Sequence, residues 1–314
     1  MQEVDDESYF NAYADLDVHE LMLRDTARNA AFRAAIESVC RGKVVLDVGA
    51  GTGLLSLYAA RAGALRVYAV EASGLATLLP DVVAANGFEN VISVLHGRAE
   101  EVELPEQVDV LVSEWVGFHL LHESMLDSVV SARARWLKPD GLMLPSEARV
   151  FAAPVNMDAW ATEHFQFWTS VDGFDLSAFV PHVAAAAVQE PLVTLVEASQ
   201  LLAPPCRAAS IDCATVSIGE LSETGGLCRF RASRSGIVHG YALWFELTFP
   251  GCDAVLSNAP GQPPTHWKQT VVLLPEMLMA TAEVTTLDCS LVLRKDRLLP
   301  RACEIELEVL GQDD

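Results

Sequence analysis

The first half of the chain alternates short apolar runs with longer stretches in which apolar residues recur at helical spacing. Five runs are apolar enough to be strands that are buried on both faces: 44–48, 67–70, 91–95, 108–112 and 142–144. Residues 53–62, 73–86 and 120–137 have the pattern of helices, as do residues 8–40 before the first run. Buried strands that alternate with helices predict a parallel sheet with covering helices.

After Pro145 the pattern changes to a period of two. Apolar residues occupy positions 243, 245, 247 and 249 in one segment and 305, 307 and 309 in another, with Trp, Glu or Thr between them. This alternation predicts antiparallel strands with one face toward solvent. We therefore expect N-terminal helices at 1–42, an α/β domain at 43–145 and a β-rich domain at 146–314.

An aromatic, helix-like stretch at 157–180 interrupts the β-rich half. Its six aromatic residues are Trp160, Phe165, Phe167, Trp168, Phe174 and Phe179. They could be ordinary core, but so many in a short stretch favour an apolar patch that a partner buries.

The chain of 314 residues is 51% hydrophobic and 20% charged, which is typical of a globular protein. Its formal net charge of −22 disfavours direct binding to nucleic acid or to an anionic membrane. The same charge would attract a basic, arginine-rich partner, although it could serve solubility alone.

Seven cysteines, at positions 40, 206, 213, 228, 252, 289 and 303, are scattered and form no CxxC pair. They predict neither a disulfide framework nor a metal site, and they favour a reducing compartment. The acidic start of the sequence lacks the apolar core of a signal peptide, and no apolar run approaches the roughly 20 residues of a membrane span. We expect a soluble, intracellular protein.

A glycine turn follows the first predicted strand, with Gly49, Gly51 and Gly53 in a GxGxG pattern. Glycine lets the backbone approach a ligand closely, although such a turn could also serve only to pack a helix on a strand. A dinucleotide fingerprint would need glycine at position 54, which is Leu54. Glu71, at the end of the second predicted strand, can accept both hydroxyls of a ribose.

S-adenosyl-L-methionine fits this turn better than a dinucleotide because it has no pyrophosphate. Arg28 can bind its carboxylate and the Gly49 region its amine. Glu100 follows the third predicted strand, where an adenine would lie, unless it is simply an exposed glutamate.

Two glutamates, Glu114 and Glu123, lie nine positions apart in the apolar and aromatic segment SEWVGFHLLHESML (113–126). Carboxylates in such surroundings are costly unless a cation meets them, and a guanidinium can satisfy both with forked hydrogen bonds. Either glutamate alone could be a solvated loop residue; as a pair they indicate a clamp for an arginine side chain.

These motifs resemble those of the type I protein arginine N-methyltransferases, over nearly the whole chain. The resemblance is carried by YFNAY (9–13), VHELMLRDTAR (18–28), VLDVGAGTG (45–53), VEAS (70–73), the segment at 113–126 and THWKQT (265–270). The double-glutamate segment and the THW motif together are highly specific. LLHESML (120–126) and WLKPDG (136–141) are most similar to one member of that family.

The resemblance implies a Rossmann-type methyltransferase domain at 43–145 that binds S-adenosyl-L-methionine. An antiparallel β-barrel substrate domain at 146–314 would follow, with a helical dimerisation arm inserted at about 157–180. Residues 1–42 would close over the cofactor.

The resemblance also assigns site residues. For the cofactor these are Tyr13, His19, Met22, Arg28, Asp47, Gly49, Gly51, Gly53, Glu71, Ala72, Ala99, Glu100, Glu114 and Met125. For the substrate arginine they are Tyr9, Tyr13, Met22, Glu114, Glu123, Met125, His266 and Trp267. The catalytic residues would be Glu114, Glu123 and His266, with Asp25 beside the histidine.

The implied activity is methylation of arginine guanidinium nitrogens to mono- and asymmetric dimethylarginine. The expected partners are basic proteins such as histone tails and glycine/arginine-rich RNA-binding proteins, and a second copy of the chain. The expected location is the nucleus, the cytoplasm or both. Family members often have Met at position 116 and Tyr at position 118, where this chain has Val116 and Phe118. A thioether contact and a phenol hydroxyl are therefore absent, a difference that concerns the shape of the pocket and the product preference.

Two other functions are compatible with part of these features. A methyltransferase for a small molecule would explain the glycine turn but not the paired glutamates or the THW motif. A catalytically weak relative that binds or regulates a partner would be indicated by loss of a clamp glutamate or of Arg28, and all three residues are present.

Overall fold

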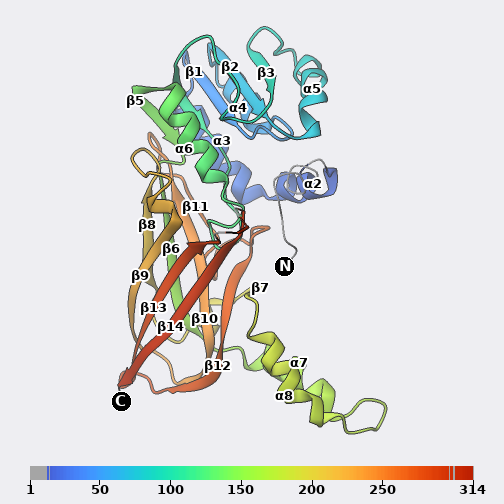
Figure 1. Cartoon of the computed structure of the whole chain (residues 1–314), viewed down its shortest axis with the longest axis vertical. Helices are drawn as coiled ribbons and strands as arrows, with labels where there is room; N and C mark the ends of the chain where they lie inside the picture. The colour runs from blue at the N-terminus through green and yellow to red at the C-terminus, as the bar shows by residue number, and fades with distance from the viewer. Residues whose placement is uncertain (1–12, 14, 297, 300, 314) are drawn as a thin grey trace.

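The parallel sheet predicted for the first half of the chain is present (Figure 1). The computed structural model describes residues 13, 15–296, 298–299 and 301–313. The strands are β1 (Val44–Val48), β2 (Arg66–Glu71), β3 (Ile92–His96), β4 (Val108–Val112) and β5 (Leu137–Leu144). They pair in the order β3-β2-β1-β4-β5, with every neighbouring pair parallel. The central strand β1 is buried along its whole length, as expected of a sheet covered on both faces.

The helices of this domain differ in two places from the predicted ones. They are α4 (Leu54–Arg61), the 3₁₀ turn η1 (Gly74–Thr77), α5 (Leu79–Ala85) and α6 (Met125–Trp136). The prediction of one helix at 73–86 was wrong, because the 3₁₀ turn η1 ends before α5, which has Pro80 in its first turn. The prediction of a helix from residue 120 was also wrong: His119, Leu120, Glu123 and Ser124 all have positive φ, so α6 begins only at Met125.

In the described part of the predicted helical region 8–40, two helices precede β1. They are α2 (Leu16–Arg24) and α3 (Thr26–Val39), which are separated by Asp25 in an extended conformation. The carboxylate of Asp25 accepts a hydrogen bond from the Arg28 backbone N–H at 2.9 Å and so caps α3. Phe32 on α3 is fully buried and packs edge-to-face on Phe249, with ring centroids 5.1 Å apart, which joins these helices to the second half of the chain.

The second half forms two antiparallel sheets around a shared core. Its strands are β6 (Glu147–Val155), β7 (Leu192–Thr194), β8 (Cys206–Asp212), β9 (Glu223–Arg231), β10 (Gly236–Thr248), β11 (Val255–Ser257), β12 (Gln269–Ala280), β13 (Thr286–Lys295) and β14 (Cys303–Asp313). Two short 3₁₀ turns, η4 (Ala198–Gln200) and η5 (Glu220–Ser222), connect them. One sheet has the order β7-β12-β10-β6-β8, with β11 added to β10, and the other has the order β14-β13-β9. Phe230, Tyr241 and Leu291 are among the residues that fill the space between the two sheets, so the barrel is a closed apolar core.

The two segments with period two have different surroundings. In β14, Glu304, Glu306 and Glu308 are exposed, so this strand has the predicted solvent face. In β10 the prediction was wrong, because Trp244 is only 4% exposed and stacks on Phe151. A second apolar cluster, which includes Val155 and Met157, covers that face of the sheet.

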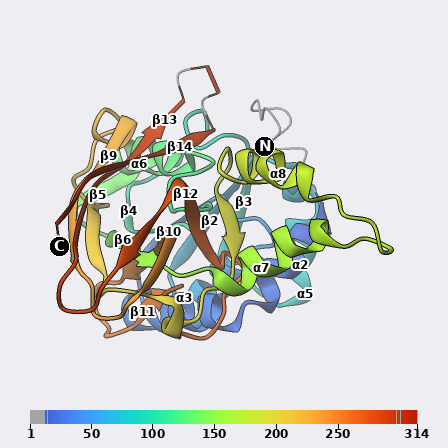
Figure 2. The ribbon, with the colours of Figure 1, turned by 90° about the horizontal axis from the view of Figure 1, so that it is seen from below.

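The aromatic stretch forms a helical arm that projects from the barrel (Figures 1 and 2). It consists of α7 (Asp158–Gln166), η2 (Phe167–Thr169), η3 (Ser177–Phe179) and α8 (Val180–Ala187), and so extends beyond the predicted end at residue 180. Phe167, Phe174 and Phe179 are 59%, 71% and 52% exposed, and neither helix contains a buried residue. These phenylalanines are therefore not part of an ordinary core.

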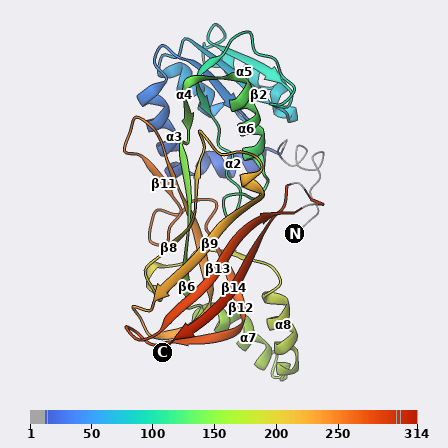
Figure 3. The ribbon, with the colours of Figure 1, turned by 60° about the vertical axis from the view of Figure 1, so that its left-hand side comes forward.

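The parallel-sheet domain is stacked end-on against the barrel, with α2 and α3 close to the junction (Figures 1 and 3). Strand β5 ends at Leu144 and β6 begins at Glu147, so the architecture changes close to residue 145. Arg133 on α6 reaches across the junction and donates to the carbonyls of Cys213 and Val216, both at 2.7 Å. In the described part of the chain, no helix is long and apolar enough to span a membrane.

Candidate active site

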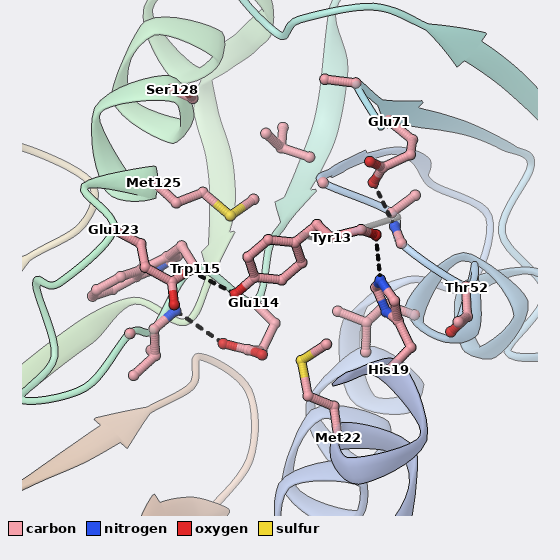
Figure 4. A pocket seen from close by; sticks show the side chains of 18 of the residues that line it. Tyr13, His19, Met22, Thr52, Glu71, Glu114, Trp115, Glu123, Met125 and Ser128 are labelled. Carbon is pink, nitrogen blue, oxygen red and sulfur yellow. Dashed lines mark hydrogen bonds between the residues drawn. The ribbon is translucent and has the colours of Figure 1, made fainter. Parts of the chain in front are cut away.

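A cavity of about 240 Å³ lies where the carboxyl ends of β1 and β2 meet α2 and the barrel. In a parallel sheet this edge is the usual place for a ligand. Its walls come from α2, the glycine turn, the loop that carries both predicted clamp glutamates, the start of α6 and the 265–267 segment (Figure 4). We call residues 114–124 the double-glutamate loop.

The glycine turn forms one wall of the cavity. Gly49 has φ +72°, and a Cβ atom there would lie 2.1 Å from the terminal methyl of Met125. A side chain at position 49 would therefore displace Met125, which also lines the cavity. Gly53, which precedes α4, also has positive φ and does not line the cavity. Its contact with the cofactor stays a prediction.

Glu71 is held rigidly at the end of β2. Its two carboxylate oxygens accept hydrogen bonds from the backbone N–H groups of Gly51 at 2.7 Å and of Ser73 at 2.8 Å, and the residue is 7% exposed (Figure 4). These bonds fix the carboxylate at the rim of the glycine turn, next to Ala72. It can still accept hydroxyl donors through its remaining lone pairs.

Asp47, which the sequence analysis assigned to the cofactor site, does not itself line the cavity. It is fully buried in β1, behind the glycine turn, and is not among the residues that line the cavity. One carboxylate oxygen accepts from the Ser56 hydroxyl at 2.7 Å, whereas the other has no protein partner among the described residues. Burial raises the pKa of Asp47 to about 7, with Glu71 contributing in the same direction and Ser56 opposing it. Asp47 therefore supports the turn from behind.

Ala99 and Glu100, just after β3, also line the cavity. The Ser128 hydroxyl on α6 donates to Glu100 at 2.6 Å, which fixes the direction of the carboxylate. Ser128 also lines the cavity, and its role was not predicted. It lies one helical turn after Met125, so the helical spacing could have revealed that both face the same side.

Glu114 is paired with a cation. Its carboxylate accepts from Arg28 Nε at 3.0 Å and from the Val116 backbone N–H at 2.9 Å. Both side chains of the ion pair are largely buried, at 10% exposure for Arg28 and 7% for Glu114. Arg28 Nη1 donates to the Asn29 side chain at 2.9 Å, so this guanidinium is oriented from two directions.

Glu123 faces the same cavity from the other end of the loop (Figure 4). The Tyr13 hydroxyl donates to its carboxylate at 2.6 Å. Glu123 has φ +79°, a conformation that costs a non-glycine residue roughly 1–3 kcal/mol and that its surroundings must enforce. Gly117, in the same loop, could not be replaced, because a Cβ there would lie 2.0 Å from the His122 carbonyl oxygen.

The THW motif lies beside the two glutamates. Asp25 accepts from the His266 backbone N–H at 3.0 Å and contacts the ring Nδ1 at 2.8 Å. Burial alone would raise the pKa of Asp25, but the bonds from His266 and the Arg28 backbone outweigh it and lower the pKa. Trp267 is 4% exposed and donates from Nε1 to the Val116 carbonyl at 2.8 Å, so it braces the double-glutamate loop.

The α2 side of the cavity carries Tyr13, His19 and Met22. His19 Nε2 lies 2.9 Å from the Tyr13 carbonyl, and the two rings pack edge-to-face with centroids 6.0 Å apart. Met22 and Met125 approach the cavity from opposite sides (Figure 4).

The cavity thus brings together most of the predicted site residues from distant parts of the chain. They are Tyr13, His19, Met22, Arg28, Gly49, Gly51, Glu71, Ala72, Ala99, Glu100, Glu114, Glu123, Met125, His266 and Trp267. Asp47 and Gly53 lie behind the wall, and Tyr9 falls outside the described residues. Besides Ser128, sequence reasoning did not find Thr52 or Arg301, which line the cavity as well.

Two histidines that the sequence analysis did not single out lie in the double-glutamate loop. His119 Nε2 is 2.9 Å from the Cys303 carbonyl of β14, and its ring centroid is 5.4 Å from that of His122. Burial lowers the pKa of His119 to about 4, with a further contribution from His122 and an opposing one from the Cys303 carbonyl. Burial also lowers the pKa of His122. The loop is therefore built around neutral histidines.

The fold and the site together define a methyltransferase with a nucleoside-containing cofactor. Residues 45–141 match the family described as a methyltransferase domain, and residues 146–313 match the arginine methyltransferase oligomerization subdomain. Protein arginine N-methyltransferase 6 of Xenopus tropicalis is 45% identical over 276 residues, which cover 85% of this chain and 81% of that protein. The chain belongs to the protein arginine N-methyltransferase family, and the relative named here is the member that segments 120–126 and 136–141 resemble.

Solved structures agree with this assignment. The Trypanosoma brucei PRMT1 enzyme–prozyme heterotetrameric complex with AdoHcy has a TM-score of 0.85 and 35% identity, over 95% of this chain and 94% of that one. A structure of PRMT6 with SAH has a TM-score of 0.79 and 32% identity, over 94% and 100% of the two chains. The predicted fold class is confirmed, and the cofactor is S-adenosyl-L-methionine. The cavity fits it, since anchored carboxylates and a buried arginine surround a glycine turn.

The neutral histidines make stability depend on pH in a defined window. The unfolded chain binds a proton at His119 near pH 6.5, whereas the folded protein does so only near pH 4, so stability falls as pH decreases through this interval. For wild type we expect His119 to account for a loss of about 3 kcal/mol at most. His119→Gln, which keeps a donor for Cys303 but does not titrate, should flatten the dependence. Urea unfolding at pH 7 and at pH 4.5 measures the free energy of unfolding of both proteins. An equal loss of stability between the two pH values in wild type and in His119→Gln would contradict the role given to His119.

Proposed function

We propose that this protein methylates arginine side chains of basic proteins, first to monomethylarginine and then to asymmetric dimethylarginine. The observation that carries the proposal is the pair of carboxylates, Glu114 and Glu123, on the cavity that Glu71 and Arg28 also line. A cofactor site and an anionic clamp thus share one enclosed space.

Four residues would hold the cofactor. Glu71, fixed by two backbone N–H groups, would accept the ribose hydroxyls, and Glu100, fixed by Ser128, would meet the adenine. Arg28 uses Nε and Nη1 for Glu114 and Asn29, and its other donors suit the cofactor carboxylate. Carbonyls near Gly49 would accept from the amine. When bound, the cofactor supplies a methyl group on a positively charged sulfur.

The two glutamates would orient the substrate guanidinium. Arginine is protonated at any working pH, so its nitrogens are poor nucleophiles. Two carboxylates that accept forked hydrogen bonds draw the positive charge toward themselves and away from the third nitrogen. They also fix the direction in which that nitrogen points, and such alignment can supply several kcal/mol of the barrier.

The substrate nitrogen must lose a proton once it carries the methyl group. In this proposal one of the two clamp glutamates, Glu114 or Glu123, accepts that proton. His266 lines the same cavity and is held at two points by Asp25, so its ring has a fixed direction. An imidazole held in a fixed direction beside the carboxylates is suited to adjust the proton affinity of the accepting glutamate or to pass the proton on.

The charge of the chain supports basic substrates. A net charge of −22 attracts arginine-rich segments, of which histone tails and glycine/arginine-rich RNA-binding proteins are the expected examples. These substrates imply a location in the nucleus, the cytoplasm or both, and the seven free cysteines are compatible with a reducing compartment.

The variant Glu123→Gln tests the clamp separately from cofactor binding. The variant should bind S-adenosyl-L-methionine normally, because Glu71 and Arg28 are intact, but turnover should fall roughly ten- to a hundredfold. Calorimetry and transfer of labelled methyl to a glycine/arginine-rich peptide measure the two effects. Glu101→Gln, at an exposed position of the same domain, is the matched control. Normal turnover of Glu123→Gln would refute the clamp, and an inactive wild type would favour a binding or regulatory protein.

The product should be asymmetric dimethylarginine. Met22 and Met125 are unbranched and flexible, so the cavity they border can admit a nitrogen that already carries one methyl group. Mass spectrometry of the methylated peptide distinguishes the isomers through their neutral losses. Exclusively monomethylated or symmetric product would show that the type I assignment is wrong.

We also propose a homodimer formed through the arm. Its exposed phenylalanines form an apolar surface that a monomer would leave in water, and docking on a second copy buries it twice in one closed pair. A partner docked close to α2 would also steady Tyr13 and the cavity.

Replacing exposed phenylalanines of the arm with charged residues should therefore prevent dimer formation and give an inactive monomer. Phe167→Glu with Phe174→Glu is the test, and Leu227→Glu, which alters an equally exposed apolar residue on β9, is the control. Light scattering gives the mass and methyl transfer the activity. A fully active monomer would show that the arm is not needed.

A further inference from the structure

The backbone of the double-glutamate loop is held in a conformation that its own residues do not favour. Positive φ angles occur at His119 (+43°), Leu120 (+77°), Glu123 (+79°) and Ser124 (+52°). None of these is glycine, and residues in this region persist only where their surroundings enforce it. Glu123, whose side chain would grip the substrate, is one of these residues and so needs an external support.

That support comes from the barrel. The Glu123 N–H donates to the Arg301 carbonyl at 2.7 Å, and Arg301 Nη1 donates back to the Glu123 carbonyl at 3.0 Å. The two residues are 178 positions apart, and both backbone polar groups of Glu123 are bonded to Arg301. Arg301 is 8% exposed and itself lines the cavity.

Neighbouring contacts come from the strand ends that flank Arg301. The carbonyl of Cys303, the first residue of β14, lies 2.9 Å from Nε2 of His119 in the loop. Lys295, the last residue of β13, is paired with Asp127 on α6, just after the loop. Among the described residues between these two strands, Arg301 is hydrogen-bonded to the backbone of Glu123.

We propose that Arg301 is a positioning residue that sets the place and direction of the Glu123 carboxylate. The inference rests on the proposed role of Glu123 as a clamp for the substrate arginine. A hydrogen bond from a charged guanidinium to a carbonyl is stronger than one from a neutral donor. The two bonds between Arg301 and Glu123 also restrict rotation of the Glu123 backbone. The barrel domain thereby contributes to the geometry of a site whose glutamates belong to the other domain.

The test compares Arg301→Gln and Arg301→Lys with wild type. Arg301→Gln should lower kcat about ten- to a hundredfold, because small displacements of an orienting group have effects of this size. Its affinity for S-adenosyl-L-methionine should stay within about twofold of wild type. Arg301→Lys, which keeps a charged donor, should recover part of the lost kcat. The matched control is Arg294→Gln on β13, an arginine that is paired with Glu306 and Glu223 at the surface.

A double-mutant cycle with Glu123→Gln separates positioning from general stability. If Arg301 acts through Glu123, Arg301→Gln should reduce kcat little further in the Glu123→Gln background. Reductions that multiply, a normal kcat for Arg301→Gln, or no recovery in a folded Arg301→Lys would each overturn the inference. A fully active Glu123→Gln would instead refute the proposed clamp, so the two failures are distinguishable.

Discussion

The site depends on placing two carboxylates, Glu114 and Glu123, on one cavity that is partly apolar. A buried carboxylate is tolerated only when cations and hydrogen-bond donors replace the water it has lost. Glu114 meets this condition through Arg28 and the Val116 N–H, and Glu123 through Tyr13. The arrangement of the N-terminal helices follows from it, since α3 carries Arg28 and its cap, Asp25, also fixes His266.

The same requirement explains why both domains are needed around one cavity. The parallel sheet can place Glu71 and the glycine turn at its carboxyl edge, but the double-glutamate loop leaves that sheet with an irregular backbone. Trp267 holds the loop at Val116 and Arg301 holds it at Glu123, and both residues belong to the barrel. The barrel is therefore a structural part of the methyltransferase site as well as the part that carries the arm.

The sequence predicted those features that arise from local pattern or local chemistry. The five buried strands, the glycine turn and Glu71 follow from periodicity and from residue types at a strand end. Features that depend on tertiary contacts were not predictable in this way. Trp244 breaks its alternation because a second cluster covers the sheet. Glu123, which stays outside the helix, is hydrogen-bonded at its backbone to Arg301 of the barrel, 178 residues away. Asp47 lies two positions before Gly49 on a strand that is buried along its whole length, so its side chain is in the core and does not line the cavity.

Charge balance in the cavity bears on the proposed binding of two cations. The charged residues that line it are the glutamates Glu71, Glu100, Glu114 and Glu123 and the arginines Arg28, Arg98 and Arg301. Arg28 is paired with Glu114 and Arg98 with Glu100. The carboxylates outnumber the guanidinium groups by one, on a lining that would receive a sulfonium and a guanidinium. In the proposed reaction, methyl transfer would leave the cofactor as a neutral thioether and would move its positive charge to the substrate nitrogen. The total positive charge would fall only when that nitrogen loses a proton. Because the spent cofactor would no longer carry a charge, the carboxylates that favour binding of the sulfonium would hold it less strongly.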